Sequence, residues 1–284
     1  MSGLIFDYLK DNYNRRCPVC GGLLPLPSLV DGGPFDGLID SIARQLFNEK
    51  VSKGSIPLEL YQKTADTFLK AMNEGLGGIS FGFEDGRNTL KAYLQQNIYA
   101  FSAAKSLTEM NHFRDLMKDA KDFTDFRNKV LDAGYQFNNN WLKTEYNTFI
   151  SSAQSASNWD KYIQNGVSVL QYSTAHDDRV RPEHAMLDGL TLPIDSPVWN
   201  TLCPPIDWNC RCHLIPGLLS KIMGNAEAGK MAKEAVKNKL FQFNPGKSKM
   251  LVSNDHPYYA AFGKIKELDA VKNYGLTSVK KLYN

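Results

Sequence analysis

The cysteines of this chain gather in two places. Cys17 and Cys20 form a Cys-x-x-Cys pair that two glycines follow. Cys210 and Cys212 form a second pair, and His184 precedes them in a stretch rich in proline, tryptophan and histidine. Five cysteines in 284 residues do not form a disulfide framework, and clustered thiols in a reducing compartment are more often metal ligands. Zinc takes four such ligands, often from tight turns.

A structural zinc ion is therefore the first interpretation, and two ligand sets fit it. In the first set, both cysteine pairs bind one ion and tie the N-terminal loop to the later stretch. In the second set, His184, Cys210 and Cys212 bind the ion, and the fourth ligand is one of Asp178, His176 or Cys203. Without a metal, the later pair consists of small packed thiols and the N-terminal pair is idle.

A catalytic interpretation uses neighbouring residues of the same stretch. The residue types needed for a Cys–His nucleophile or for a metal-activated water are present at His176, Asp177, Asp178, His184 and Cys212. However, the sequence has no H-E-x-x-H or P-loop pattern. We therefore expect no enzyme, and a metal-dependent hydrolase, either a nuclease or a toxin-like effector, is the alternative.

A structural interpretation is compatible with either of these. The carboxylate of Asp178 is expected to accept hydrogen bonds from an arginine, the candidates being Arg179, Arg181 and Arg211. Pro182 fits the first turn of a short helix that carries His184. These contacts predict a compact unit on a helical body, held together by hydrogen bonds between arginine and aspartate side chains.

Tryptophan and proline residues are expected to stabilise this compact unit. Trp199 and Trp208 can cover a small core that helices alone would leave open. Pro204 and Pro205 are expected to hold the cysteine-containing turn extended. The segment therefore predicts a rigid docking module.

The rest of the chain predicts a mostly helical α+β protein. Apolar residues recur at three- and four-residue steps through residues 36–165, in separate helical series at 39–47, 58–72, 90–101 and 110–120. The longest helix is expected over 139–164. Its apolar face includes Leu142, Phe149 and Ile163. β-Branched and aromatic residues at 167–174 predict a strand. The expected regions are an N-terminal loop (1–35), a helical body (36–165), the motif module (166–217) and a Lys-rich helical tail (218–284).

Charge is spread unevenly over the chain. Residues 221–284 hold 12 lysines, no arginine and 5 acidic residues, a balance of +7, whereas the whole chain carries +3. Such a tail suits contact with nucleic acid or an acidic protein surface, or it is a solvated helical face. No apolar run approaches the ~18 residues that a membrane helix needs, and the N-terminus lacks the pattern of a secretory signal.

The stretch from Thr174 to Cys212 resembles the core motif of the phage Mu F-like head-morphogenesis (minor head, or minor capsid, protein) family. The resemblance rests on an ordered series: Asp178, Arg179, Val180, Arg181, His184, Leu187, Gly189, Trp199, Pro204, Pro205, Trp208, Asn209, Cys210, Arg211 and Cys212. Many members have Cys-x-x-Cys where this chain has Arg181 and His184, and a histidine where it has Trp208. This departure bears on any metal site of the family.

The resemblance implies a phage virion-assembly protein that joins the head in low copy near the portal. It implies portal and other capsid proteins as partners, with phage DNA as a further partner through the Lys-rich tail. The expected location is the host bacterial cytoplasm during assembly and then the virion, in the capsid interior or at the portal vertex. No small-molecule substrate is expected, and a zinc-ribbon adaptor that binds nucleic acid is a further alternative.

Overall fold

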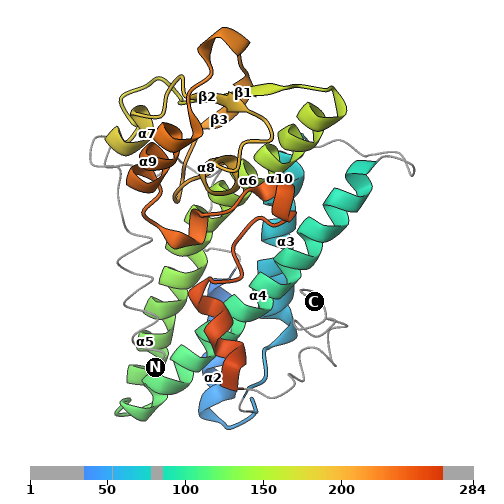
Figure 1. Ribbon diagram of the computed structural model, residues 1–284. Coiled ribbons are helices and arrows are strands. Elements are labelled where there is room, and N and C mark those ends of the chain that lie inside the picture. Colours follow the sequence, from blue (N-terminus) through green and yellow to red (C-terminus); the bar gives the residue numbers. More distant parts are fainter. Residues whose placement is uncertain (1–34, 53, 78–85, 265–284) are drawn as a thin grey trace.

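A computed structural model describes residues 35–52, 54–77 and 86–264 of the chain. A bundle of long helices forms the lower part of Figure 1, and a small sheet with short helices lies at one end of it. The mostly helical α+β class expected from the sequence is confirmed. No helix among the described residues is both long and apolar enough to cross a membrane.

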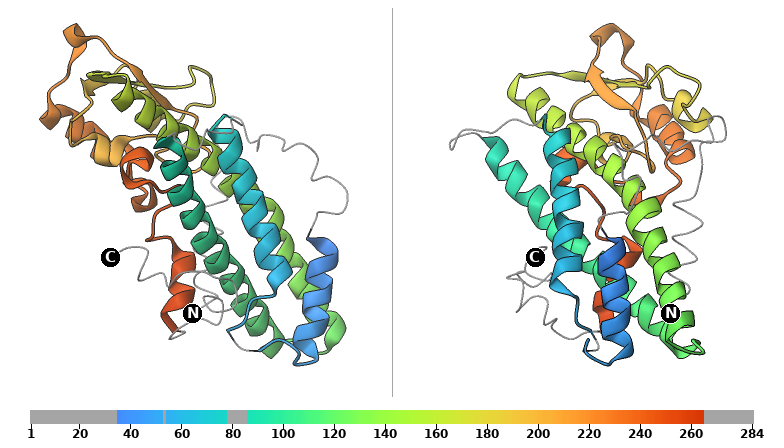
Figure 2. Two further views of the ribbon diagram at one scale, coloured as in Figure 1. Left: turned by 90° about the vertical axis from the view of Figure 1, so that its right-hand side faces the viewer. Right: turned by 180° about the vertical axis from the view of Figure 1, so that it is seen from behind.

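Within the described residues, the bundle consists of five helices and one π-helical segment. Their bounds are α2 (Asp36–Phe47), α3 (Leu58–Gly75), α4 (Gly86–Lys118), α5 (Phe123–Tyr135), η1 (Gln136–Trp141, the π-helix) and α6 (Leu142–Gln164). Helix α3 packs against α4 and α6, and α2 packs against α5. The two views of Figure 2 show these long helices side by side.

Aromatic rings fill the centre of the bundle. The ring of Phe68 lies 5.5 Å from that of Phe101 and 4.7 Å from that of Phe149, measured between centroids. All three side chains are fully buried. Burial of large apolar side chains contributes about 1.5–3 kcal/mol each, so this cluster stabilises the body.

A buried polar network crosses the same core. The ammonium group of Lys105 lies 3.0 Å from a carboxylate oxygen of Glu145, and both side chains are fully buried. Lys105 also donates to the backbone carbonyl of Phe137, and the Tyr258 hydroxyl donates to Glu145 over 2.9 Å. Glu109 accepts from Asn138 nearby. This network joins α4, η1 and α6 to the segment that contains Tyr258.

Two details of the body differ from the sequence-based expectation. The apolar residues at 90–101 and 110–120 lie mostly on one helix, α4, instead of on two, and the united helix is longer than α6. Helix α6 begins at Leu142, after the π-helix, and its expected core residue Ile163 is 55% exposed. Ile163 lies in the last turn, where the helix has passed beyond the bundle core.

A three-stranded antiparallel sheet follows the bundle. Its order is β2 (Thr191–Pro193), β1 (Val169–Ser173) and β3 (His213–Pro216). In the register, Leu170 pairs with Leu192 on one side, and Tyr172 pairs with Leu214 on the other. The strand expected at 167–174 is therefore confirmed. Strand β1 holds the central place because both neighbours bond to it.

The remaining elements are short. They are α7 (Pro182–Ala185), α8 (Trp199–Leu202), η2 (Leu219–Lys221), α9 (Asn225–Ala235), η3 (Lys239–Phe241), α10 (Pro245–Ser248) and η4 (Pro257–Lys264). Helix α10 packs on α6, and η4 packs along α4. Tyr258 of η4 is fully buried. The chain thus returns to the bundle after the sheet (Figure 1).

Candidate functional site: a histidine–cysteine cluster in a braced module

Three ligand-type side chains converge beside the sheet. His184 lies on α7, which begins at Pro182 because a proline fits the first turn of a helix. Cys210 follows a tight turn, closed by a hydrogen bond from its amide to the carbonyl of Asp207. Cys212 directly precedes β3. All three side chains are buried, with 2–6% of their surface exposed.

The distances within this cluster are short. The Nδ1 atom of His184 lies 3.6 Å from the Sγ atom of Cys210 and 3.6 Å from that of Cys212. The three ligand atoms all lie within 4.8 Å of one another. The sequence-based prediction that these residues meet is therefore confirmed.

The two thiols differ in acidity. Burial acts to raise the pKa of the Cys210 thiol, but hydrogen bonds from Cys212 and His184 outweigh burial and hold this pKa well below its ordinary value. The hydrogen bond to Cys210, together with burial, raises the pKa of Cys212. The pair therefore favours one thiolate, on Cys210, and disfavours a second one unless a positive charge joins the cluster.

Tyr172 brings a fourth polar group to the cluster. Its side chain is fully buried on β1, and its hydroxyl lies against the Cys212 thiol. Among the described residues this hydroxyl has no nitrogen or oxygen partner. Burial raises the pKa of Tyr172 well above its ordinary value, so the phenol keeps its proton. The sequence does not single out Tyr172, because an aromatic side chain in a strand is ordinarily a core residue.

A carboxylate–arginine cluster braces the loops on the surface. The Arg211 guanidinium donates to both carboxylate oxygens of Asp177, each over 2.7 Å, and Arg179 donates to the same carboxylate. These hydrogen bonds, that of Arg211 first, hold the pKa of Asp177 well below its ordinary range. The expectation that Asp178 accepts from these arginines is wrong, because Asp178 lies exposed and Asp177, one position earlier, faces them.

Arg181 braces the turn itself. It donates to the backbone carbonyl of Trp208 over 2.8 Å, and it lies 3.7 Å from the carboxylate of Asp207. The turn at 207–210 needs a left-handed residue, and Asn209 supplies it with a φ of 56°. The expected cysteine-containing turn is thus present, at 207–210.

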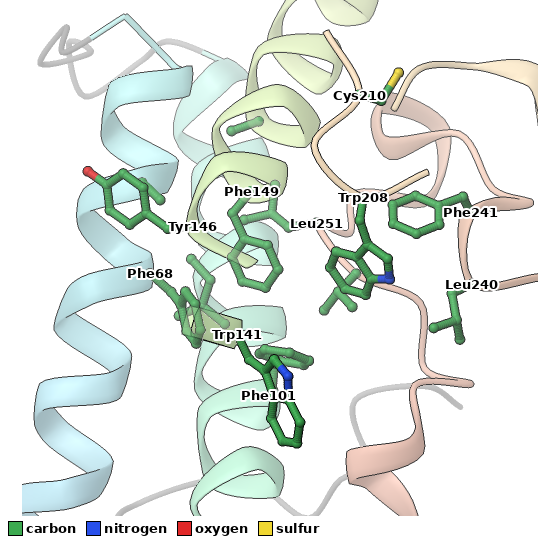
Figure 3. Close-up of a cluster of buried hydrophobic side chains, with 14 of the residues drawn as sticks. Phe68, Phe101, Trp141, Tyr146, Phe149, Trp208, Cys210, Leu240, Phe241 and Leu251 are labelled. Atoms are coloured by element: carbon green, nitrogen blue, oxygen red, sulfur yellow. The ribbon is translucent and has the colours of Figure 1, made fainter. Parts of the chain in front are cut away.

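Asn209 and Trp208 join the module to the bundle. The Asn209 amide donates to Thr148 of α6, and its side chain accepts from Asn147. The Trp208 ring is buried and meets Phe241 edge-on at 4.9 Å. Figure 3 shows Trp208 near the aromatic core on one side and Phe241 on the other, with Cys210 above it. The expected roles of Trp208 and of Trp199, which is also buried, as core residues are confirmed.

The other proposed ligands lie elsewhere. His176 is exposed and pairs with Asp188 over 2.9 Å. Cys203 is a buried free thiol outside the cluster, and its pKa is raised by burial. Cys17 and Cys20 lie outside the described residues. Of the residues proposed for catalysis, the structure brings only His184 and Cys212 together, since Asp177 is occupied by arginines.

This module lies within a family match. Residues 99–215 match the family described as Phage Mu protein F like protein. The matched range runs from α4 to β3 and contains the cluster, the arginine braces and the turn. This region of the chain is therefore similar to the Mu F-like family, and the resemblance stated from the sequence is confirmed.

Two relatives match shorter segments. The chain is 35% identical over 75 residues to the putative capsid assembly protein F of Escherichia phage Mu, a match that covers 26% of this chain and 17% of the phage protein. It is 41% identical over 44 residues to the Mu-like prophage FluMu F protein of Haemophilus influenzae, covering 16% and 11%. The chain thus spans less than a fifth of either relative. No solved structure matches it.

Proposed function

We propose that the protein is a phage head-morphogenesis protein that assembles with capsid proteins and enters the virion in low copy near the portal. The observation that carries this proposal is the module at 166–217, where the family motif forms one braced unit around a buried cluster. A rigid unit with few mobile groups loses little entropy on docking. The Mu F-like match and the name of the phage Mu relative support the same role.

An exposed apolar loop marks a docking surface at the far end of the module. Leu218, Leu219 and Ile222 expose 60%, 72% and 42% of their surfaces. They lie between β3 and α9, on the loop at the top of Figure 1. Apolar groups that are clustered and exposed in this way are typical of interaction sites. The occupant we propose is a capsid or portal subunit.

Particle composition tests the assembly role. Tagged full-length protein should co-purify with phage heads at fewer copies than the major capsid protein, and cross-linking should join it to the portal. Serine at Leu218 and Leu219 should reduce incorporation without changing the melting temperature. The matched control is serine at Tyr135 and Ile163, which are 59% and 55% exposed and lie on the helices of the bundle. This control variant should be incorporated as well as the wild type. Heads that lack the wild-type protein would contradict the proposal.

Contact with packaged DNA is the second part of the proposal. Seven lysines of the tail are exposed: Lys221, Lys230, Lys233, Lys237, Lys239, Lys247 and Lys249. Exposed lysines bind phosphates by releasing counterions, so the affinity falls with salt.

A charge-matched comparison tests the DNA contact. Glutamine at Lys221, Lys230, Lys233 and Lys237 should weaken binding to duplex DNA. It should also reduce the slope of the logarithm of the binding constant against the logarithm of the salt concentration by about 0.9 per lost phosphate contact. Glutamine at the exposed body residues Lys50, Lys70, Lys118 and Lys121 should have little effect. If the two sets of variants weakened DNA binding equally, binding would depend only on the total charge of the protein, and a specific role of the tail would be refuted.

A further inference from the structure

The geometry of the histidine–cysteine cluster points to a bound metal ion. We propose that His184, Cys210 and Cys212 are three ligands of a structural zinc ion that ties α7, the 207–210 turn and β3 together. This inference does not depend on the proposed function, because it concerns the folding of the module and not its partner.

The distances fit the coordination shell of zinc. With Zn–S near 2.3 Å and Zn–N near 2.0–2.1 Å, a tetrahedral angle places the nitrogen and sulfur ligand atoms about 3.6 Å apart. Both Nδ1–Sγ distances of His184 have this value. A thiol and an imidazole that merely pack together need no such pair of equal distances, so the arrangement has the shape of a preformed site.

Charge favours a divalent ion at this place. Two thiolates and one neutral imidazole balance the charge of Zn²⁺, and a neutral site is compatible with the full burial of the three side chains. Soft sulfur ligands with one imidazole select zinc over magnesium or calcium, which prefer oxygen. No carboxylate belongs to the cluster among the described residues.

The buried hydroxyl of Tyr172 is an independent observation. Polar groups in protein interiors are nearly always hydrogen-bonded, and this hydroxyl has neither nitrogen nor oxygen as a partner among the described residues. It lies against the thiol of Cys212, where it can donate to a metal-bound thiolate. Metal ligands ordinarily receive such support from a second layer of groups. Tyr172 is thus a positioning residue of the site.

A bound ion would also stabilise the short elements around the cluster. The strands next to the cluster are only three to five residues long, and α7 has four. Elements of this length contribute few backbone hydrogen bonds of their own. A zinc ion bound to the folded state alone supplies folding free energy, as in other small metal-tied modules.

Metal content of the full chain is the first test. Protein purified without chelators should contain about one zinc ion per chain by elemental mass spectrometry. Cys210→Ser, Cys212→Ser and His184→Ala should each lose it. Cys203→Ser is the matched control, because it removes a buried thiol of the same module outside the cluster and should keep the ion. Wild-type protein without zinc, or ligand variants that retain it, would overturn the assignment.

Cobalt substitution keeps the test valid if a ligand variant fails to fold. Wild-type protein loaded with Co²⁺ should show the sulfur-to-cobalt charge-transfer absorption and the visible bands of a tetrahedral site. Tyr172→Phe should keep these bands and weaken zinc binding by about 10–100-fold. Absorption of octahedral cobalt without a charge-transfer band would refute the proposal.

The N-terminal pair provides the last comparison. A Cys17→Ser/Cys20→Ser variant separates the contribution of that pair from that of the cluster. Loss of zinc from the three cluster variants supports the assignment whatever this variant does. Loss from the N-terminal variant alone, with zinc retained in the cluster variants, would move the ion to the N-terminal pair and overturn it.

Discussion

The helical body and the module use charged residues in opposite ways. In the body, Lys105 and Glu145 are both fully buried and satisfy each other inside an aromatic core. In the module, the arginines and Asp177 remain partly exposed and surround a buried cluster of weakly polar ligands. Buried charges affect global stability because leaving one unpaired is costly, whereas exposed pairs mainly fix local geometry.

Removal of the buried ammonium group should have the largest effect. Lys105→Met leaves the Glu145 carboxylate without its cation in the core, which should lower the free energy of unfolding by about 3–5 kcal/mol. Urea denaturation measures this loss. The double variant Lys105→Met/Glu145→Leu should recover much of it, because no unpaired charge then remains.

The matched control for this variant lies on the surface of the same helix. Lys118 pairs with Asp115, and their side chains expose 72% and 41% of their surfaces. Lys118→Met should therefore change the stability by less than about 1 kcal/mol. If the two methionine variants were equally stable, the contrast between buried and exposed charge would not hold.

The pH dependence of Glu109 sharpens the comparison. Burial raises the pKa of this fully buried carboxyl from 4.5 to about 8. The folded state therefore binds a proton that the unfolded state releases, and stability falls as the pH rises from about 4.5 through 8. Above this range the ionised carboxylate costs a few kcal/mol, because each tenfold change in proton affinity corresponds to about 1.4 kcal/mol.

Glu109→Gln should remove this penalty. The amide oxygen can still accept from Asn138, which bonds the carboxyl in the wild type. The variant should match the wild type near pH 4 and be more stable by a few kcal/mol near pH 9. Urea titrations at both values measure the difference. A constant difference between the two proteins at every pH would contradict the prediction.

Close helix packing predicts an intermediate effect. A Cβ atom added at Gly75, in the last turn of α3, would lie 2.4 Å from the carbonyl oxygen of Ile150 on α6. Gly75→Ala should therefore cost about 1–3 kcal/mol. Gly229→Ala, in α9 with nothing within 4 Å, should instead stabilise by about 0.5–1 kcal/mol. Thermal melting of both variants distinguishes the two.

The smallest global effect is expected in the module. Arg211→Lys replaces the two-pronged contact with Asp177 by a single point charge. The melting temperature should barely change, but amide hydrogen exchange in the 176–181 loop should accelerate. Arg44→Lys, in an exposed pair on α2, should leave that loop unchanged. A large drop in melting temperature for Arg211→Lys would mean that the exposed brace supports the whole fold.

The helical class and the strand were predictable because periodicity reports burial directly. Apolar repeats located α2, α3 and α6, and a β-branched run located β1. The union of two apolar series into α4 was not predictable, since the residues between them, such as Ser106, are polar yet buried in that helix. The buried Lys105 was missed for a similar reason, because lysine is ordinarily a surface residue.

The cluster was predictable from residue types, but its supports were not. His184, Cys210 and Cys212 are rare side chains gathered in one short stretch, so their meeting followed from composition and turn signals. The choice between Asp177 and Asp178 depends on the path of one loop, which adjacent identical residues do not reveal. Tyr172 carries no signal in a strand pattern, and only its position opposite the thiols shows its role.

The π-helix at Gln136–Trp141 sets the rotation of α6 about its own axis relative to α5. Such a wide turn accommodates an additional residue, and in an α-helix one residue corresponds to a rotation of about 100°. Deleting one residue there would restore a regular helix and rotate α6 by that angle relative to α5. Phe149 would then leave the aromatic core, and Asn147 and Thr148 would turn away from Asn209. A stretch of six residues in the bundle thus aligns the module with the body, so insertions and deletions there should be tolerated far less than substitutions.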